Sequence, residues 1–151
     1  INKLKEDTTG RNHIYSKFAE TILDTGKEGI AFRTDVELLH YALDRADLKP
    51  ERISSCSFRT AVVDYSDRDN PVNLLQNPSI KQDGTVYAED ADSVIALDKI
   101  YVINDLQKCF AGILEIIYQM RNMLVHGKLN PDKEAHDVVK YCYRILWELM
   151  N

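Results

Sequence analysis

The strongest constraint on the fold is a long apolar stretch that ends near Val125. Its apolar side chains recur every three or four residues, the spacing of one face of an α-helix. They are Leu106, Phe110, Ile113, Ile117, Met120 and Leu124, with an earlier stripe at Val94, Leu97 and Tyr101. An unbroken helix from 91 to 125 would far exceed the mean helix length of about 11–12 residues. We therefore expect helix over 91–125 with a break near Asn104.

Two more helices are expected in the N-terminal third. The first, over residues 11–25, carries Ile14, Phe18 and Ile22 at steps of four, and Gly26 is a suitable stop. The second begins at the tetrapeptide TDVE, where Thr34 and Glu37 have the pattern of a capping box. Its apolar periodicity continues to about residue 47.

The remaining segments complete an all-α fold. Residues 132–150 have helical periodicity, and the short link before them predicts packing antiparallel to the preceding helix. Pro50 suits the first turn of a further helix, and residues 51–64, which mix strand-like and helical spacing, are read as helix. Residues 65–90 contain prolines, glycine and little periodicity, which indicates a long irregular insertion. We expect a single domain over 1–151, built as an antiparallel helical bundle. Because the sequence begins at Ile1 and not at Met, we also expect a processed chain or a fragment of a longer protein.

Composition points to an ordinary globular protein of the cytoplasm. Hydrophobic residues make up 44% of the 151 residues and charged residues 28%. No apolar run approaches the ~20 residues that a membrane span needs, and no signal peptide opens the chain. Three cysteines, Cys56, Cys109 and Cys142, lie far apart without metal-ligand spacing. We read them as buried reduced thiols, and expect no metal and no cofactor.

The charge is distributed unevenly along the chain. The net charge of −5 argues at first against a nucleic-acid partner. Residues 64–105 hold nine acidic and three basic residues, whereas residues 118–144 hold five basic and three acidic ones. The C-terminal segment is therefore locally basic, although solvated helix faces often have the same composition.

That basic segment contains the sequence YQMRNMLVHG, which places Arg121, Asn122 and His126 at the end of the apolar stretch. Residues four apart share a helix face, so Asn122 would lie one turn below His126. Arg121 and His126 are five apart and about 140° out of register on a straight helix. Gly127 could end the helix in a left-handed conformation and re-aim His126. A second copy of the chain could supply the convergence instead.

A purely structural interpretation is open for the same residues. A histidine in a last helical turn interacts favourably with the helix dipole by roughly 0.3–1 kcal/mol. Arg121 could cover apolar surface with its aliphatic stem. Spacing alone favours this interpretation. The other histidines, His13, His40 and His136, are read as structural, and the tyrosines Tyr118, Tyr141 and Tyr143 as core or dimer contacts, with base stacking as the alternative.

The motif resembles the signature of the HEPN domain family. In that family an arginine, usually followed by a polar residue, precedes a histidine by four to six intervening residues at the end of an apolar helix. Here Arg121, Asn122 and His126 fit the form Arg-Asn-x-x-x-His, followed by Gly127 and a final helix. The resemblance implies a metal-independent endoribonuclease, with two motifs facing each other across a homodimer. It also implies a toxin or phage-defence effector, with an antitoxin or companion domain as a further partner.

The chemistry implied by the resemblance assigns a role to each residue. His126 would take the proton from a ribose 2′-hydroxyl, since its pKa is closest to neutral. Arg121 would hold the scissile phosphate with its planar fork, and Lys128 would assist in binding RNA. Asn122 would orient His126 or donate to phosphate, and the product would carry a 2′,3′-cyclic phosphate. Two alternatives remain: a non-catalytic nucleotide-binding or dimerisation module, and a plain helical interaction domain.

Overall fold

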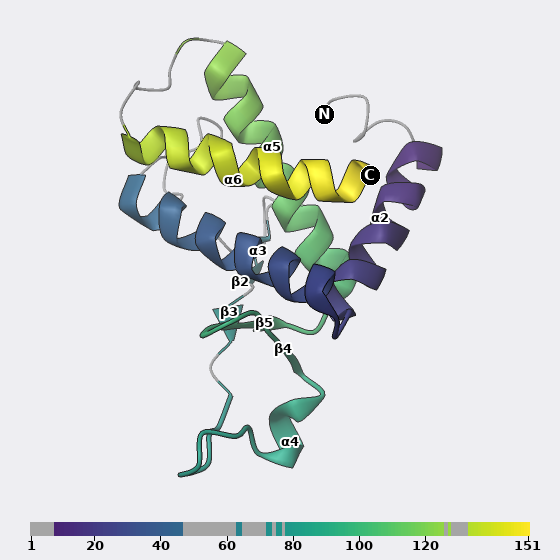
Figure 1. Cartoon of the computed structure of the whole chain (residues 1–151), viewed down its shortest axis with the longest axis vertical. Helices are drawn as coiled ribbons and strands as arrows, with labels where there is room; N and C mark the ends of the chain where they lie inside the picture. The colour runs from purple at the N-terminus through teal and green to yellow at the C-terminus, as the bar shows by residue number, and fades with distance from the viewer. Residues whose placement is uncertain are drawn as a thin grey trace.

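The structure is a computed structural model that describes residues 8–46, 63–64, 72–73, 75–76, 78–125, 127 and 133–151. Most of these residues are helical. The helices are α2 (Thr8–Leu23), α3 (Lys27–Ala46), α4 (Ala88–Ala91), α5 (Leu106–Val125) and α6 (Lys133–Met150). The strands are β1 (Val63–Asp64), β2 (Val72–Asn73), β3 (Leu75–Gln76), β4 (Val94–Ala96) and β5 (Tyr101–Ile103). Helices α2, α3, α5 and α6 form the body, and the segment around α4 projects from one end (Figure 1).

Helix α5 is the central element of the fold. Five consecutive residues, Ile113 to Ile117, are buried, so the helix is covered on every side and not along one stripe only. The buried set includes Glu115 and Gln119, whose side chains hydrogen-bond to each other at 3.0 Å. The predicted helix up to Val125 is confirmed from Leu106 onwards. Its predicted single stripe is too narrow, and Leu124 at the end of that stripe is 50% exposed.

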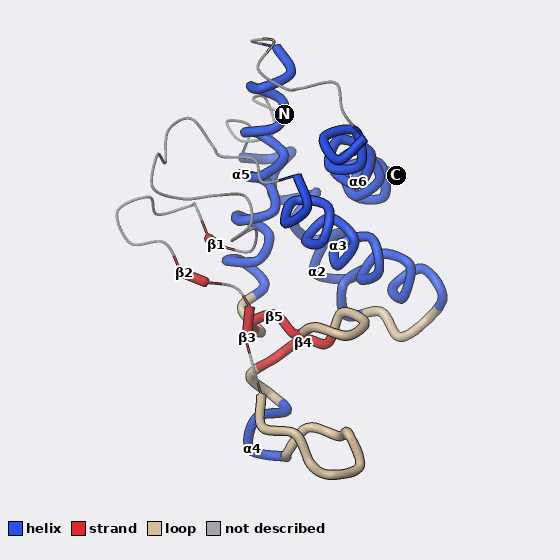
Figure 2. Tube along the Cα trace, turned by 90° about the vertical axis from the view of Figure 1, so that its left-hand side faces the viewer, coloured by secondary structure: helices blue, strands red, loops and turns tan. Residues whose placement is uncertain are grey.

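Helices α3 and α6 lie antiparallel to each other across one side of α5 (Figures 1 and 2). Two ion pairs join them, Arg45 to Asp137 at 3.9 Å and Arg144 to Asp35 at 3.7 Å. The predicted helix over 132–150 is confirmed, but its antiparallel packing on α5 is wrong, because α6 crosses α5 steeply and pairs along its length with α3. The direction of α6 is set by its contacts and ion pairs with α3, which a prediction from the length of the link does not include.

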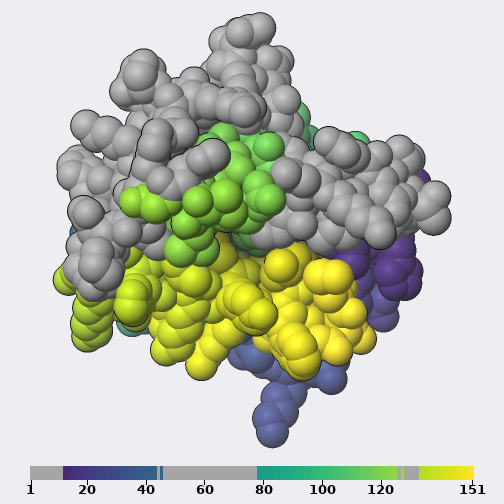
Figure 3. Space-filling model, turned by 90° about the horizontal axis from the view of Figure 1, so that it is seen from above, coloured from purple at the N-terminus to yellow at the C-terminus, as the bar shows by residue number. Residues whose placement is uncertain are grey.

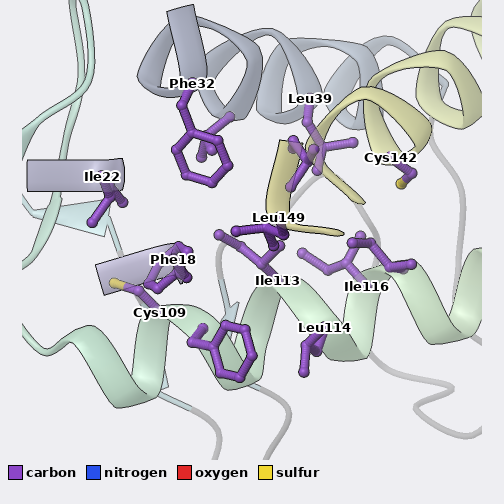
Figure 4. Close-up of a cluster of buried hydrophobic side chains, with 14 of the residues drawn as sticks. Phe18, Ile22, Phe32, Leu39, Cys109, Ile113, Leu114, Ile116, Cys142 and Leu149 are labelled. Carbon is purple, nitrogen blue, oxygen red and sulfur yellow. The ribbon is translucent and has the colours of Figure 1, made fainter. Parts of the chain in front are cut away.

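Side chains from four helices meet in a single core (Figure 4). Phe18 of α2 lies 5.9 Å from Phe32 of α3 and 5.4 Å from Phe110 of α5, measured between ring centroids. Helix α6 contributes Val138, Cys142, Ile145 and Leu149 to the same cluster. Cys109 and Cys142 are buried thiols, as predicted; Cys56 lies outside the described residues.

The turn between α2 and α3 is held by Asp24 and Arg33. The Asp24 carboxylate accepts a hydrogen bond from the Gly29 amide at 3.0 Å, and Arg33 donates to the carbonyls of Ile22 and Asp24 at 2.9 and 2.6 Å. These bonds satisfy backbone groups at the two helix ends. The predicted helix over 11–25 is confirmed, with its end at Leu23.

The predicted capping box is wrong. Helix α3 begins at Lys27, so Thr34 lies inside the helix and its hydroxyl donates to the Ile30 carbonyl at 2.9 Å. Glu37 does not return to the backbone of Thr34. Its Oε1 accepts three amides from the turn between β4 and β5, those of Asp98 (3.1 Å), Lys99 (2.7 Å) and Ile100 (2.9 Å). The capping-box pattern is misleading here because Glu37 is buried and its carboxylate binds a turn far away in the sequence.

A small antiparallel sheet replaces the predicted helix between 94 and 103. Strand β5 pairs with β4 on one side, with Ile95 opposite Val102, and with β3 on the other. Ile95, Leu97 and Val102 are buried at the base of α5. The spacing of the apolar residues over 94–103 is compatible with a helix or with strands. The contacts of this segment with Glu37 and α5 favour the strands. The expected break near Asn104 is confirmed, because α5 starts two residues later.

The irregular insertion expected around 65–90 is partly ordered where it is described. It contributes β2, β3, the bridge between Ile80 and Val86, and the short helix α4. The prediction of helix over 51–64 is wrong where that segment is described, because β1 is a strand paired with β2. The proposed helix start at Pro50 lies outside the described residues. No helix of the described chain combines the length and apolarity needed to cross a membrane.

Candidate functional site

Arg121 and Asn122 lie in the last part of α5, where the helix leaves the core. Both side chains are half-buried. Arg121 Nη1 donates a hydrogen bond to Asn122 Oδ1 at 3.2 Å, so the two side chains act as one unit. This contact draws the guanidinium along the helix surface instead of letting it extend freely into solvent. Arg121 and Asn122 are therefore positioned by a helix most of whose residues are buried in the core.

Gly127 ends the helix as the sequence predicts. Its φ is +65°, in the left-handed region that glycine adopts most easily, and its amide donates to the Leu124 carbonyl at 3.2 Å. An added Cβ would meet nothing within 4 Å, so the requirement for glycine is conformational and not steric. The backbone at Gly127 therefore does not continue the right-handed helix of α5.

The histidine of the motif lies outside the described residues, as does Lys128. The structure therefore brings together Arg121, Asn122 and the Gly127 turn. Convergence of Arg121 with His126, and the RNA-binding role of Lys128, stay predictions.

A cavity of about 270 Å³ opens beside Arg121 between α5 and α6. Its walls are Ile117, Met120, Leu124, Val125, Val139, Cys142, Tyr143 and Leu146. Arg121 is the only charged residue of the described lining. Figure 3 shows the end of α5 at the molecular surface beside the length of α6. The site is thus a guanidinium at the edge of an apolar hollow.

Exposed apolar side chains extend this hollow outward. Leu124 is 50% exposed, Val125 63% and Tyr143 70%, and all three line the cavity. Trp147, one turn further along α6, is 65% exposed. The interpretation of Tyr143 as a core residue of this chain is wrong, because its side chain is exposed; a dimer contact and base stacking stay predictions.

The Arg121 guanidinium has N–H donors that its hydrogen bond to Asn122 does not use. Within the described chain no carboxylate lies within 4 Å of it, whereas Arg45 and Arg144 each pair with an aspartate. An arginine has five N–H donors, and the contact with Asn122 uses one of them. The remaining fork can bind two oxygens of a phosphate or a carboxylate.

The described residues contain no group of three or more histidine, cysteine, aspartate or glutamate side chains that could hold a metal ion. The histidines outside the motif and Tyr141 lie on other parts of the helices. His13 and His136 are exposed, His40 is half-buried against Tyr41, and Tyr141 is half-buried beneath Lys140 and Arg144. Cys142 lines the cavity, but burial raises the pKa of its thiol to about 12, so it is not a nucleophile at neutral pH.

Sequence reasoning missed a pair of carboxyl groups between α3 and α6. Asp35 is buried, and Glu148 is half-buried beside it. Burial is the main cause that raises the pKa of Glu148 to about 7; the Asp35 charge and a hydrogen bond with Asp35 raise it further, and Arg144 opposes the shift. No sequence signal links the two positions, because only the packing of α6 on α3 brings them together.

No family model, curated protein or solved structure matches this chain.

Proposed function

We propose that this chain is a HEPN-like, metal-independent endoribonuclease. The observation that carries the proposal is the arrangement of Arg121 and Asn122. They are joined by a hydrogen bond at the end of a central buried helix, next to a left-handed glycine, and no described carboxylate neutralises the guanidinium. An arginine kept without an acidic partner is suited to an external anion. The same residues carry the motif that resembles the family signature.

Each residue has a defined role in the proposed reaction. His126 removes the proton from the ribose 2′-hydroxyl, which then attacks the adjacent phosphorus. Arg121 binds the non-bridging oxygens as charge develops on them, with Asn122 holding its orientation and Lys128 contacting a neighbouring phosphate. The bond from phosphorus to the 5′-oxygen breaks and the leaving oxygen takes a proton from water, so the products are a 2′,3′-cyclic phosphate and a free 5′-hydroxyl; His126 later returns its proton to solvent. DNA lacks the nucleophile and is not cleaved.

The proposed active form is a homodimer with a composite site. Arg121 and His126 are about 140° apart on a straight helix, so a facing copy supplies the missing half of the site. The apolar cavity beside Arg121 and the exposed Leu124, Val125, Tyr143 and Trp147 supply a surface for that copy. Single exposed apolar residues are ordinary, but a contiguous patch around a hollow is typical of an interface.

The biological setting that fits such an enzyme is a toxin or phage-defence effector in the cytoplasm, restrained by an antitoxin or a companion domain. This setting rests on the family resemblance alone.

A second candidate is a non-catalytic HEPN-like module that binds a nucleotide or only dimerises. The wholly apolar lining beside Arg121 and the net charge of −5 favour it, since long RNA is attracted poorly to an acidic protein. This candidate predicts saturable nucleotide or RNA binding without a cyclic-phosphate product.

The test is RNA cleavage in EDTA with the wild type, Arg121→Ala and His126→Ala. We expect the rate to fall by roughly 10²–10³-fold for Arg121→Ala and 10²–10⁴-fold for His126→Ala, with cyclic-phosphate ends in the wild-type product. His136→Ala is the matched control, because it removes an exposed histidine from the neighbouring helix. Equal cleavage by all four proteins, or loss in the control alone, contradicts the assignment.

A further inference from the structure

Two carboxyl groups, those of Asp35 and Glu148, lie between α3 and α6 and have no role in the proposed ribonuclease reaction. Asp35 of α3 is 8% exposed, and Glu148 lies near the end of α6. Both line one open cavity of about 520 Å³, together with Lys140, Tyr143, Arg144 and Trp147. Because α3 and α6 are antiparallel, this pair lies further towards the C-terminus of α6 than the Arg45–Asp137 ion pair.

The two carboxyl groups are poorly compensated if both are ionised. Arg144 Nη1 lies 3.7 Å from Asp35 Oδ1, but its side chain is 52% exposed and partly hydrated. Glu148 Oε2 is buried and has no hydrogen-bond partner within the described chain. A buried ionised oxygen without a donor is costly, and a second carboxylate beside it adds repulsion. A proton on Glu148 removes both penalties and provides a donor for Asp35.

We infer that Asp35 and Glu148 share one proton, and that this proton fastens the C-terminal turns of α6 to α3. Loss of the proton leaves two adjacent carboxylates, and that end of α6 loosens. The inference goes beyond the proposed function and does not depend on it.

The charged groups around the pair set where it titrates. Those lining the two cavities that border Glu148 are Lys17, Lys27, Glu28, Asp35, Lys140 and Arg144. Burial and Asp35 raise the pKa of Glu148 to about 7 from the ordinary value of 4.5, against the lowering by Arg144. The folded state therefore binds the proton more tightly than the unfolded state. This stabilisation is complete below about pH 4.5 and is lost progressively as the pH rises through about 7.

The pair has a natural reporter in Trp147. It is the single tryptophan of the sequence, it precedes Glu148, and it lines both cavities that border this carboxyl group. A change in the packing of the end of α6 therefore changes its fluorescence. Tyr143 also lines the cavity beside Arg121, so movement of α6 reaches that site.

The experiment follows tryptophan fluorescence and urea unfolding between pH 5 and 9 for the wild type, Glu148→Gln and Asp35→Asn. We expect a wild-type fluorescence midpoint near pH 7 and a stability that falls as the pH rises to that value. Glu148→Gln keeps a donor towards Asp35, so it should abolish the midpoint and retain the low-pH signal throughout. Asp35→Asn removes the neighbouring charge and should move the midpoint to lower pH.

Glu134→Gln is the matched control, an exposed glutamate in the first turn of the same helix that should leave the midpoint unchanged. A wild type without a midpoint between pH 6 and 8, or the same midpoint in Glu148→Gln, overturns the inference. Should a variant fail to fold, carbon-13 NMR of the wild-type glutamate carboxyl groups decides. One group titrating near pH 7 supports the shared proton, and all groups titrating below pH 5.5 refute it.

Discussion

Single residues determine where the helices of this protein begin and end. Gly29 lies in the first turn of α3, where the backbone of Asp24 approaches closely. A Cβ at this position would lie 2.0 Å from the Asp24 carbonyl oxygen. Glycine is otherwise unfavourable in a helix by about 1 kcal/mol relative to alanine, so its presence reflects this contact.

We expect Gly29→Ala to destabilise the protein by about 1–3 kcal/mol, because the clash with backbone atoms outweighs the gain in helix propensity. Urea unfolding followed by circular dichroism measures the change. Gly26→Ala is the control, since its Cβ would meet only the Asp24 side chain, at 3.3 Å. Equal stability of Gly29→Ala and the wild type would refute this account of the turn.

At the scale of elements, Glu37 connects the sheet to the helical body. Its Oε1 accepts three successive amides of the β4–β5 turn, and no other described side chain bonds to those amides. Hydrogen bonds to a charged group contribute about 1.5–3 kcal/mol, more than neutral ones, because the acceptor is ionised. The sheet at the base of α5 therefore depends on one carboxylate of α3.

Glu37→Ala should lower the free energy of unfolding by about 3 kcal/mol, and Glu37→Gln by roughly half of that, since an amide oxygen still accepts. The Ile100 amide should exchange with deuterium faster in both variants. Glu20→Ala, which removes an exposed glutamate of α2, should change neither property. Unchanged exchange at Ile100 in Glu37→Ala would mean that the turn is held by other contacts.

The sequence predicted the elements whose stability is local and missed those that depend on distant partners. Helices α2, α5 and α6 and the left-handed Gly127 were found, because apolar spacing and glycine are read within a few residues. The hairpin at 94–103 was misassigned, since Glu37 and the base of α5 select it from far away. Arg121 and Asn122 are predicted by the motif, whereas their mutual hydrogen bond depends on side-chain conformation and the apolar cavity beside them depends on the packing of α6. The Asp35–Glu148 pair had no local signal.

At the scale of the whole molecule, one region of the surface is unusually apolar. The hollow between the end of α5 and α6, with Leu124, Val125 and Tyr143 around it, faces away from the core. The segment around α4 projects from the opposite end of the body (Figures 1 and 2). The molecule therefore offers two distinct ends, of which the one beside Arg121 is the proposed dimer contact.

Leu124→Glu and Tyr143→Glu should each convert a wild-type dimer to monomer and abolish RNA cleavage, because a buried charge opposes association. Light scattering after size-exclusion chromatography measures the state. Ile80→Glu is the matched control, an equally exposed isoleucine at the distant end that should leave the dimer intact. A monomeric wild type that still cleaves RNA would refute the composite site while leaving the catalytic residues in place.

The burial of α5 has a consequence for how such a protein can diversify. The two polar residues of the motif are carried by α5, most of whose residues are buried, whereas part of the wall of the hollow beside them comes from α6. A substitution at the exposed Tyr143 therefore changes the wall of the hollow without disturbing the core, whereas a change of volume at the buried Ile116 disturbs the helix that carries Arg121. The exposed rim of the hollow therefore tolerates a change of side chain better than the buried stretch of α5 that positions Arg121.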